Sequence, residues 1–292
     1  MKHNFYNGAD YLPQDVLQRL LTWIQADEHI RAAVLNGSRT NPRVRADWLQ
    51  DVDLACYVDN LADSPYRLDR SWMDAFGEPA VVQHNALEDG AFITMVQFTN
   101  ALRIDFSVWS VQQISRVWAD SLSVALADKD ERLLGLPPAS EVSYYVRPPS
   151  VAEWNTCLNE IAWLAPYVAR ALWRAEMPRA LDILHAYLIP QVRQVLSWQA
   201  AQPRGWQVNL GVSGRWLGRY LDPQLYSEFL ALYVPADEAA IWQAVDQVLR
   251  LTESSALRLA DALGSGYRFP YQDWERVRIF IAQIKAEPRN NS

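Results

Sequence analysis

The sequence changes character at a proline-rich break, VRPPS, over residues 146–150. Before the break, short alternating patterns typical of strands mix with helical ones, whereas the patterns after it are long and helical. The helical patterns cover 151–175, 178–201, 223–234 and 237–263. We therefore predict an α+β protein with a mixed sheet flanked by helices over 1–145, followed by a helical bundle domain over 146–292.

The N-terminal part combines helix and strand patterns. Apolar residues recur at helical spacing over 15–28, and a second helix is predicted over 66–77. Strand patterns cover 31–37, 51–58, 91–98 and 102–109. The last two flank a short turn, which predicts an antiparallel hairpin.

The composition narrows the class of partner. The chain has 292 residues, half of them hydrophobic, and a net charge of −7, which suits a cationic small ligand and disfavours nucleic acid. No apolar run approaches the roughly 20 residues that span a bilayer, and the N-terminus lacks the apolar core of a signal peptide. Cys56 and Cys157 match no metal or redox spacing. We expect a cytoplasmic monomer that binds neither membranes nor nucleic acid.

Three aspartates fall on alternating strand patterns. In DVDLACYV (51–58) the apolar residues occupy one face, so Asp51 and Asp53 share the other. In LRIDFSVW (102–109) the same alternation puts Asp105 on the polar face. If the two strands are neighbours, the three carboxylates converge, which is stable only around a cation or with a proton bound. Anionic oxygens suit Mg²⁺, which also takes substrate phosphates.

A small-residue turn, Gly37-Ser38, precedes the aspartate pair. Glycine lets the backbone approach a phosphate closely, and the turn N–H groups and the Ser38 hydroxyl could hold it. An isolated D-x-D is usually a solvated strand edge. Combined with the turn and the distant Asp105, it predicts a nucleotidyl-transfer site that takes a metal-bound nucleoside triphosphate.

This arrangement of GS, DxD and a distal aspartate resembles the signature of polymerase-beta-like nucleotidyltransferases. More closely, it resembles the aminoglycoside 6-adenylyltransferases, the streptomycin-modifying resistance enzymes. The segments that carry the resemblance are LNGSRTN (35–41), LQDVDL (49–54), LRIDFSV (102–108), RPPSVAEWNTCLNEIAW (147–163), RALDIL (179–184) and GVSGRWLGRYL (211–221). Two positions depart from the family pattern: Asn36 replaces an acidic residue, and Val212 replaces a lysine, with Arg215 at the second basic position.

The resemblance implies transfer of AMP from ATP to the 6-hydroxyl of streptomycin, with two Mg²⁺ ions as cofactors. It implies that Asp51, Asp53 and Asp105 bind metal. It implies nucleotide binding by Gly37, Ser38, Arg39 and Arg215. The base would be Asp105 or Glu160. The alternatives are the same transfer to another aminocyclitol, a lincosamide-type drug or a protein side chain, and a non-catalytic nucleotide-binding relative.

Acidic residues of the helical part are candidates for binding a cationic acceptor. Glu153 and Glu160 are seven residues apart, so they lie near one face of the predicted helix 151–175, offset from its apolar stripe. They either form a solvated face or overhang a cleft and meet the substrate. Asp182 either binds substrate or pairs with Arg179.

Overall fold

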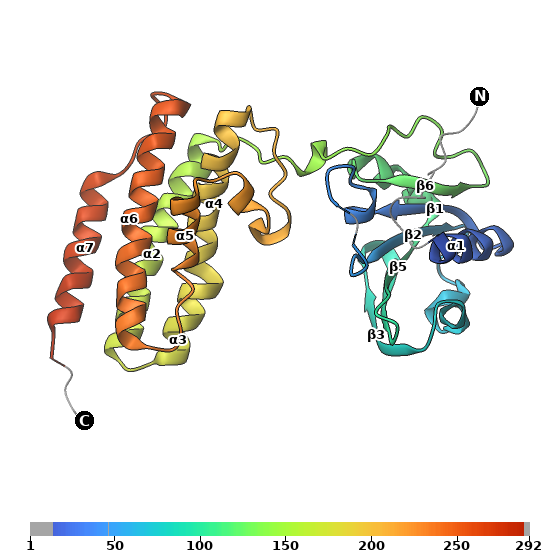
Figure 1. The fold of residues 1–292 in the computed structure, drawn as a ribbon, viewed down its shortest axis with the longest axis horizontal. Helices are drawn as coiled ribbons and strands as arrows, with labels where there is room; N and C mark the ends of the chain where they lie inside the picture. The colour runs from blue at the N-terminus through green and yellow to red at the C-terminus, as the bar shows by residue number, and fades with distance from the viewer. Residues whose placement is uncertain (1–13, 46, 289–292) are drawn as a thin grey trace. The chain divides into compact units, whose positions relative to one another are not determined.

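The computed structural model describes residues 14–45 and 47–288, and the chain divides into two compact units between Ser143 and Tyr144 (Figure 1). The first unit contains a mixed sheet with helices, and the second is helical, which confirms the predicted α+β class. No helix within the described residues is long and apolar enough to cross a membrane.

One sheet organises the N-terminal unit. Within the described residues it has six strands in the order β3-β4-β5-β2-β1-β6. The strands are β1 (Ile30–Asn36), β2 (Val52–Val58), β3 (Pro79–Ala86), β4 (Phe92–Phe98), β5 (Arg103–Ser110) and β6 (Val124–Asp128). The central pair β2 and β5 is parallel, and the other neighbouring pairs are antiparallel. The predicted hairpin is β4 and β5.

The two faces of this sheet carry different cores. On one face, α1 (Gln14–Ala26) packs through Leu20 and Ile24 against inward-facing strand residues such as Leu54 and Phe106. The burial of alternate residues on β2 and β5 explains why their polar positions face the other way. That second face has a smaller core around Tyr57, which begins beyond the aspartates along β2.

Three parts of the N-terminal unit differ from the sequence predictions. The helix predicted over 66–77 is wrong: the chain forms two short 3₁₀ segments, Pro65–Arg67 and Ser71–Ala75. Between them the Asp69 carboxylate accepts hydrogen bonds from the Ser71 N–H and hydroxyl, a local turn that competes with a helix. Strands β3 and β6 were not predicted. They form the two edges of the sheet, where a strand needs fewer apolar residues.

The C-terminal unit is built from helices that share one apolar core. They are α2 (Val151–Trp173), α3 (Met177–Asp182), α4 (Ile189–Ala201), α5 (Pro223–Leu230), α6 (Glu238–Leu263) and α7 (Tyr271–Ala286). The helix predicted over 178–201 is interrupted by a π-helical turn, Ile183–Leu188. Pro190 follows this turn and has no N–H to donate, which accounts for the break in regular α-helical bonding. Helix α7 was not predicted.

Candidate active site

The parallel pairing of β2 and β5 brings two of the predicted carboxylates together. Asp53 and Asp105 are direct register partners, and Val52 pairs with Ile104 on the buried side. Asp51 immediately precedes β2. The side chain of Asp105 is 12% exposed and that of Asp51 36%. The strands are therefore neighbours, which was the condition for the predicted convergence of the carboxylates.

Arg103, at the start of β5, binds two of the three carboxylates. Its Nε and Nη2 atoms donate to the two oxygens of Asp105 at 2.9 and 2.7 Å. Its Nη1 atom lies 3.1 Å from Asp51 Oδ2. The guanidinium thus joins Asp51 and Asp105, and both contacts are charge-assisted.

Asp53 has an unusual pKa. Burial is the largest cause that raises this pKa from 3.8 to about 6, followed by the charges of Asp105 and Asp51. The charge of Arg103 acts in the opposite direction but does not cancel them. Near neutral pH the Asp53 carboxylate is therefore ionised at a cost to the fold, as expected for a buried acid beside two other carboxylates.

The Gly37 turn lies directly against Asp53. Residues Gly37–Thr40 form a 3₁₀ turn at the end of β1, and Asn36 pairs with Asp53 across β1 and β2. Gly37 has φ +77°, and a Cβ placed on it would lie 2.3 Å from Asp53 Oδ2. Any side chain at residue 37 would therefore displace the carboxylate, so the glycine is needed for Asp53 as well as for the turn.

Arg39 is buried in the turn, whereas Ser38 is partly exposed. Arg39 is 1% exposed, and its Nε atom donates to the Asp51 carbonyl at 2.9 Å. The guanidinium also donates to the Gln50 carbonyl. Arg39 thus holds the backbone that carries Asp51. The Ser38 backbone carbonyl accepts hydrogen bonds from Asn41 and Gln50, and its side chain is partly exposed.

Sequence reasoning did not find Asp120, which lies near this cluster. Asn36 Nδ2 donates to Asp120 Oδ2 at 3.2 Å and to Ser123 Oγ at 2.7 Å. The charge of Asp120 also contributes to raising the pKa of Asp53. An acidic group is thus present beside residue 36, although residue 36 itself is an asparagine. Asp120 lies outside the strand patterns, so the sequence gives no periodic signal for it.

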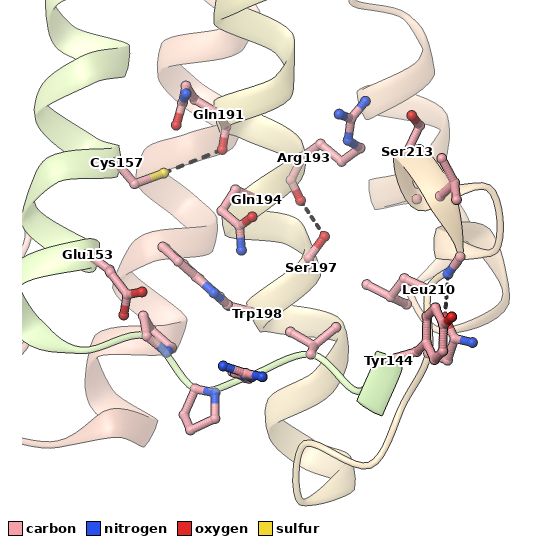
Figure 2. A pocket seen from close by; sticks show the side chains of 18 of the residues that line it. Tyr144, Glu153, Cys157, Gln191, Arg193, Gln194, Ser197, Trp198, Leu210 and Ser213 are labelled. Carbon is pink, nitrogen blue, oxygen red and sulfur yellow. Dashed lines mark hydrogen bonds between the residues drawn. The ribbon is translucent and has the colours of Figure 1, made fainter. Parts of the chain in front are cut away.

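The C-terminal unit has a cavity of about 830 Å³ bordered by α2, α4 and the loop Asn209–Gly214 (Figure 2). Two arginines, Arg147 and Arg193, line it together with Glu153 and several uncharged polar side chains. Figure 2 shows Arg193 directed toward the loop that carries Ser213. The cavity therefore offers donors for an anion, and one carboxylate.

The remaining predicted residues lie in or near this unit's helices. Glu153 lines the cavity, and its Oε2 accepts hydrogen bonds from the Ser150 N–H and hydroxyl in a capping box, which lowers its pKa. Glu160 lies two turns further along α2 and is partly exposed. Its charge adds to burial in raising the pKa of Cys157, one turn away, to about 12. Glu160 is not among the residues that line the cavity.

Asp182 and Arg215 lie outside the cavity lining. Asp182 is exposed at the end of α3, and Arg179 pairs with Glu176 at 3.9 Å instead of with Asp182. Arg215 follows the cavity loop, and its guanidinium lies 4.3 Å from the centre of the Trp216 ring. Arg215 therefore presents a cation beside the loop, although Val212, 79% exposed, supplies none.

Comparison with known proteins supplies the family. A family model described as streptomycin adenylyltransferase matches residues 13–284. The chain belongs to this family. It is therefore a nucleotidyltransferase, as the turn and the three aspartates predicted, and the resemblance seen in the sequence is confirmed.

Individual relatives of this chain have low sequence identity to it, but they match over most of their length. The "Aminoglycoside 6-adenylyltransferase" of Campylobacter jejuni is 26% identical over 280 residues, covering 93% of this chain and 95% of that protein. The protein of the same name from Bacillus subtilis (strain 168) is 23% identical over 273 residues, covering 90% and 93%. A crystal structure of an aminoglycoside 6-adenyltransferase from Bacillus subtilis matches with a TM-score of 0.48 and 19% identity, covering 94% of this chain and all of that one.

Transfer of a nucleotidyl group needs positive charge beside the phosphates, and a divalent cation is one group that can supply it. Asp51, Asp53 and Asp105 provide the hard, anionic oxygens that Mg²⁺ prefers. Among residues 14–45 and 47–288, however, no group of three His, Cys, Asp or Glu side chains is already arranged to hold a metal ion. Two of the carboxylates are instead bound to Arg103. The three carboxylates are thus of the chemical kind that a divalent cation binds, although two of them face Arg103 in this structure.

Proposed function

We propose that this enzyme transfers AMP from ATP to the 6-hydroxyl of streptomycin, and so gives resistance to the antibiotic, as a cytoplasmic monomer. The observation that supports this most directly is the register pair Asp53–Asp105 beside the Gly37 turn, in a chain of the streptomycin adenylyltransferase family. The names of the relatives point to the same class of acceptor.

In the proposed mechanism, the carboxylates of Asp51, Asp53 and Asp105 would hold two Mg²⁺ ions, whose charge would offset that of the triphosphate and pyrophosphate. Arg39 acts indirectly, because its bonds to the carbonyls of residues 50 and 51 fix the backbone that carries Asp51. The backbone N–H groups of the turn and the Ser38 hydroxyl bind a phosphate group, and Arg215 contributes a cation to nucleotide binding.

The chemical step is an in-line displacement at the α-phosphorus. The acceptor oxygen forms a bond to phosphorus as the bond to the bridging oxygen breaks, and pyrophosphate leaves with that electron pair. The hydroxyl proton passes to a carboxylate. We assign this role to Asp105, with Glu160 as the alternative base.

Streptomycin carries two guanidinium groups and an amine, so its binding site should be acidic. We assign Glu153, Glu160 and Asp182 to this site. One oxygen of Glu153 already accepts the capping bonds from Ser150, whereas Asp182 is exposed at a helix end. Asp182 is therefore the side chain best placed to pair with a substrate cation without disturbing the fold.

The direct test is mass spectrometry of streptomycin incubated with the protein, ATP and Mg²⁺. We expect a product heavier by one AMP group, attached at the 6-hydroxyl, together with release of pyrophosphate. If streptomycin stayed unmodified while another aminocyclitol, a lincosamide or a protein side chain was adenylylated, the proposed acceptor would be wrong. Binding of ATP without pyrophosphate release with any acceptor would instead show a non-catalytic relative.

Steady-state kinetics should separate the roles of the carboxylates. A carboxylate that only binds the substrate raises KM when neutralised, whereas the base lowers kcat. We expect Asp182→Asn to raise the KM for streptomycin about two- to fivefold, with kcat within about twofold of wild type, because a substrate cation loses an exposed partner. Raising the salt concentration should reduce this difference, because charge attraction is screened over about 8–10 Å.

The same kinetics decide between the two candidate bases. A fall in kcat for Glu160→Gln, with KM unchanged, would transfer the base from Asp105 to Glu160. Unchanged constants in both Asp182→Asn and Glu160→Gln would remove these residues from the acceptor site.

A further inference from the structure

A cation already lies among the carboxylates that we assign to metal binding. Arg103 occupies both oxygens of Asp105 and one oxygen of Asp51, through three of its nitrogens. These are carboxylate oxygens that a divalent cation would use. Mg²⁺ binds oxygen at about 2.0–2.1 Å, closer than any guanidinium nitrogen can approach. The two cations therefore compete for the same oxygens, and they also repel each other.

Arg103 can leave without unfolding its surroundings. Its side chain is 37% exposed, and it lies on the first residue of β5, beside the turn that joins β4 and β5. Its register partner on β4 is Gln97, which is exposed and uncharged. Rotation of the side chain away from the cluster thus breaks the contacts to Asp105 and Asp51 and weakens the attraction to Asp53, without burying a charge.

We propose that Arg103 is an exchangeable counter-cation, which neutralises Asp51 and Asp105 in the metal-free enzyme and moves away when a divalent cation binds. This inference rests on the proposed function for the identity of the metal ligands, and it adds a residue that sets the affinity of the site. Arg103 weakens metal binding by competition while it stabilises the protein without metal. The enzyme thus exchanges one cation for another, and the carboxylates are never left without a positive neighbour.

Arg31 provides a matched control elsewhere in the same sheet. Its guanidinium also holds both oxygens of one aspartate, Asp130, and lies near a second, Asp59. It lies on β1, and its side chain is 28% exposed, similar to Arg103. Replacing Arg31 therefore removes an equivalent set of ion pairs without touching the proposed metal ligands.

The test measures binding of Mn²⁺ to the full-length protein without nucleotide, by electron paramagnetic resonance of the free ion. We expect Arg103→Gln to bind Mn²⁺ about tenfold more tightly than wild type, because a competing charge is removed. We also expect its metal-free form to melt at a lower temperature, and Mn²⁺ to raise that temperature more than it does in wild type. Arg31→Gln should also lower the melting temperature, with wild-type Mn²⁺ affinity.

Equal or weaker Mn²⁺ binding by Arg103→Gln would overturn the exchange. If that variant does not fold, Arg103→Lys provides the same test: a lysine keeps the charge but cannot form the two-pronged contact, so Mn²⁺ should bind more tightly than to wild type. Asp105→Asn tests the proposed metal site separately from the proposed role of Arg103. If wild type binds Mn²⁺ and Asp105→Asn does not, the metal site stands and only the role of Arg103 is at stake. Absence of Mn²⁺ binding in both wild type and Arg103→Gln would overturn both.

Discussion

Replacing Asp53 by asparagine should abolish adenylyl transfer and at the same time stabilise the metal-free protein. Loss of a carboxylate from the metal site removes several kcal/mol of transition-state stabilisation, so we expect kcat to fall at least about 10³-fold. The fold should gain because Asp53 is ionised beside Asp51 and Asp105, and asparagine has the same shape without the charge.

The size and pH dependence of this gain follow from the pKa of Asp53. A native pKa of about 6, against 3.8, means that the native state holds the proton more tightly than the unfolded chain. The protonated form therefore stabilises the fold fully below about pH 3.8, and this contribution is lost as the pH rises through 6. At pH 7.5 we expect Asp53→Asn to be more stable by about 1–3 kcal/mol, and near pH 4 by less than about 1 kcal/mol.

Urea unfolding at the two pH values, without divalent cations, measures this effect. Asp74→Asn is the control, because Asp74 is an exposed aspartate of the same unit and its charge should not matter. Wild-type turnover by Asp53→Asn would contradict the assignment of Asp53 to the metal site. If Asp53→Asn kept wild-type turnover but gained the predicted stability, Asp53 would be an electrostatically unfavourable residue with no role in catalysis.

Gly37→Ala should lower kcat by displacing the carboxylate of Asp53. The added Cβ would lie 2.3 Å from Asp53 Oδ2, far inside contact distance, so Asp53 has to move. A shift of about 1 Å in a reacting group costs on the order of 10²-fold in rate, which is the loss of kcat that we expect. The φ of +77° adds backbone strain of about 1–2 kcal/mol to any residue with a side chain.

Gly135→Ala separates the clash from the strain. Gly135 has a similar φ, +83°, but a Cβ there would meet nothing within 4 Å. We expect this control to lose about 1–2 kcal/mol of stability in urea unfolding and to keep wild-type kcat. If the two alanine variants lost the same stability and both kept full activity, the position of Asp53 would not depend on the missing side chain of residue 37.

The parts of the site that were predictable are those governed by burial. Alternation along β2 and β5 places Val52 and Ile104 in the core, and this alone fixes which way Asp53 and Asp105 point. The edge strand β3 was missed because most of its residues are exposed on both faces, so its sequence carries no alternation. Helix α7 was missed for a related reason: only Trp274 and Ile281 are buried, too few for a continuous apolar stripe.

The detailed roles of the polar residues could not be derived from spacing. Arg39 follows Gly37 and Ser38 in the turn, yet it points into the protein, because two backbone carbonyls there need a donor. Arg103 is two residues from Asp105 and so shares its face, but only the parallel neighbour β2 brings Asp51 within its reach. Such contacts depend on which strands are neighbours, and alternation within one strand does not carry that information.

The buried guanidinium of Arg39 also joins the two ends of the loop between β1 and β2. It ties residue 39 to the carbonyls of residues 50 and 51, so the ends of the intervening segment are fastened at its base. Trp48 and Leu49, within that segment, are 70% and 61% exposed. Replacing the exposed side chain of Trp48 therefore leaves the contacts of Arg39 with residues 50 and 51 in place. Trp48 is therefore a position where a fluorescent or spin probe would lie outside the contacts that hold the Asp51 backbone.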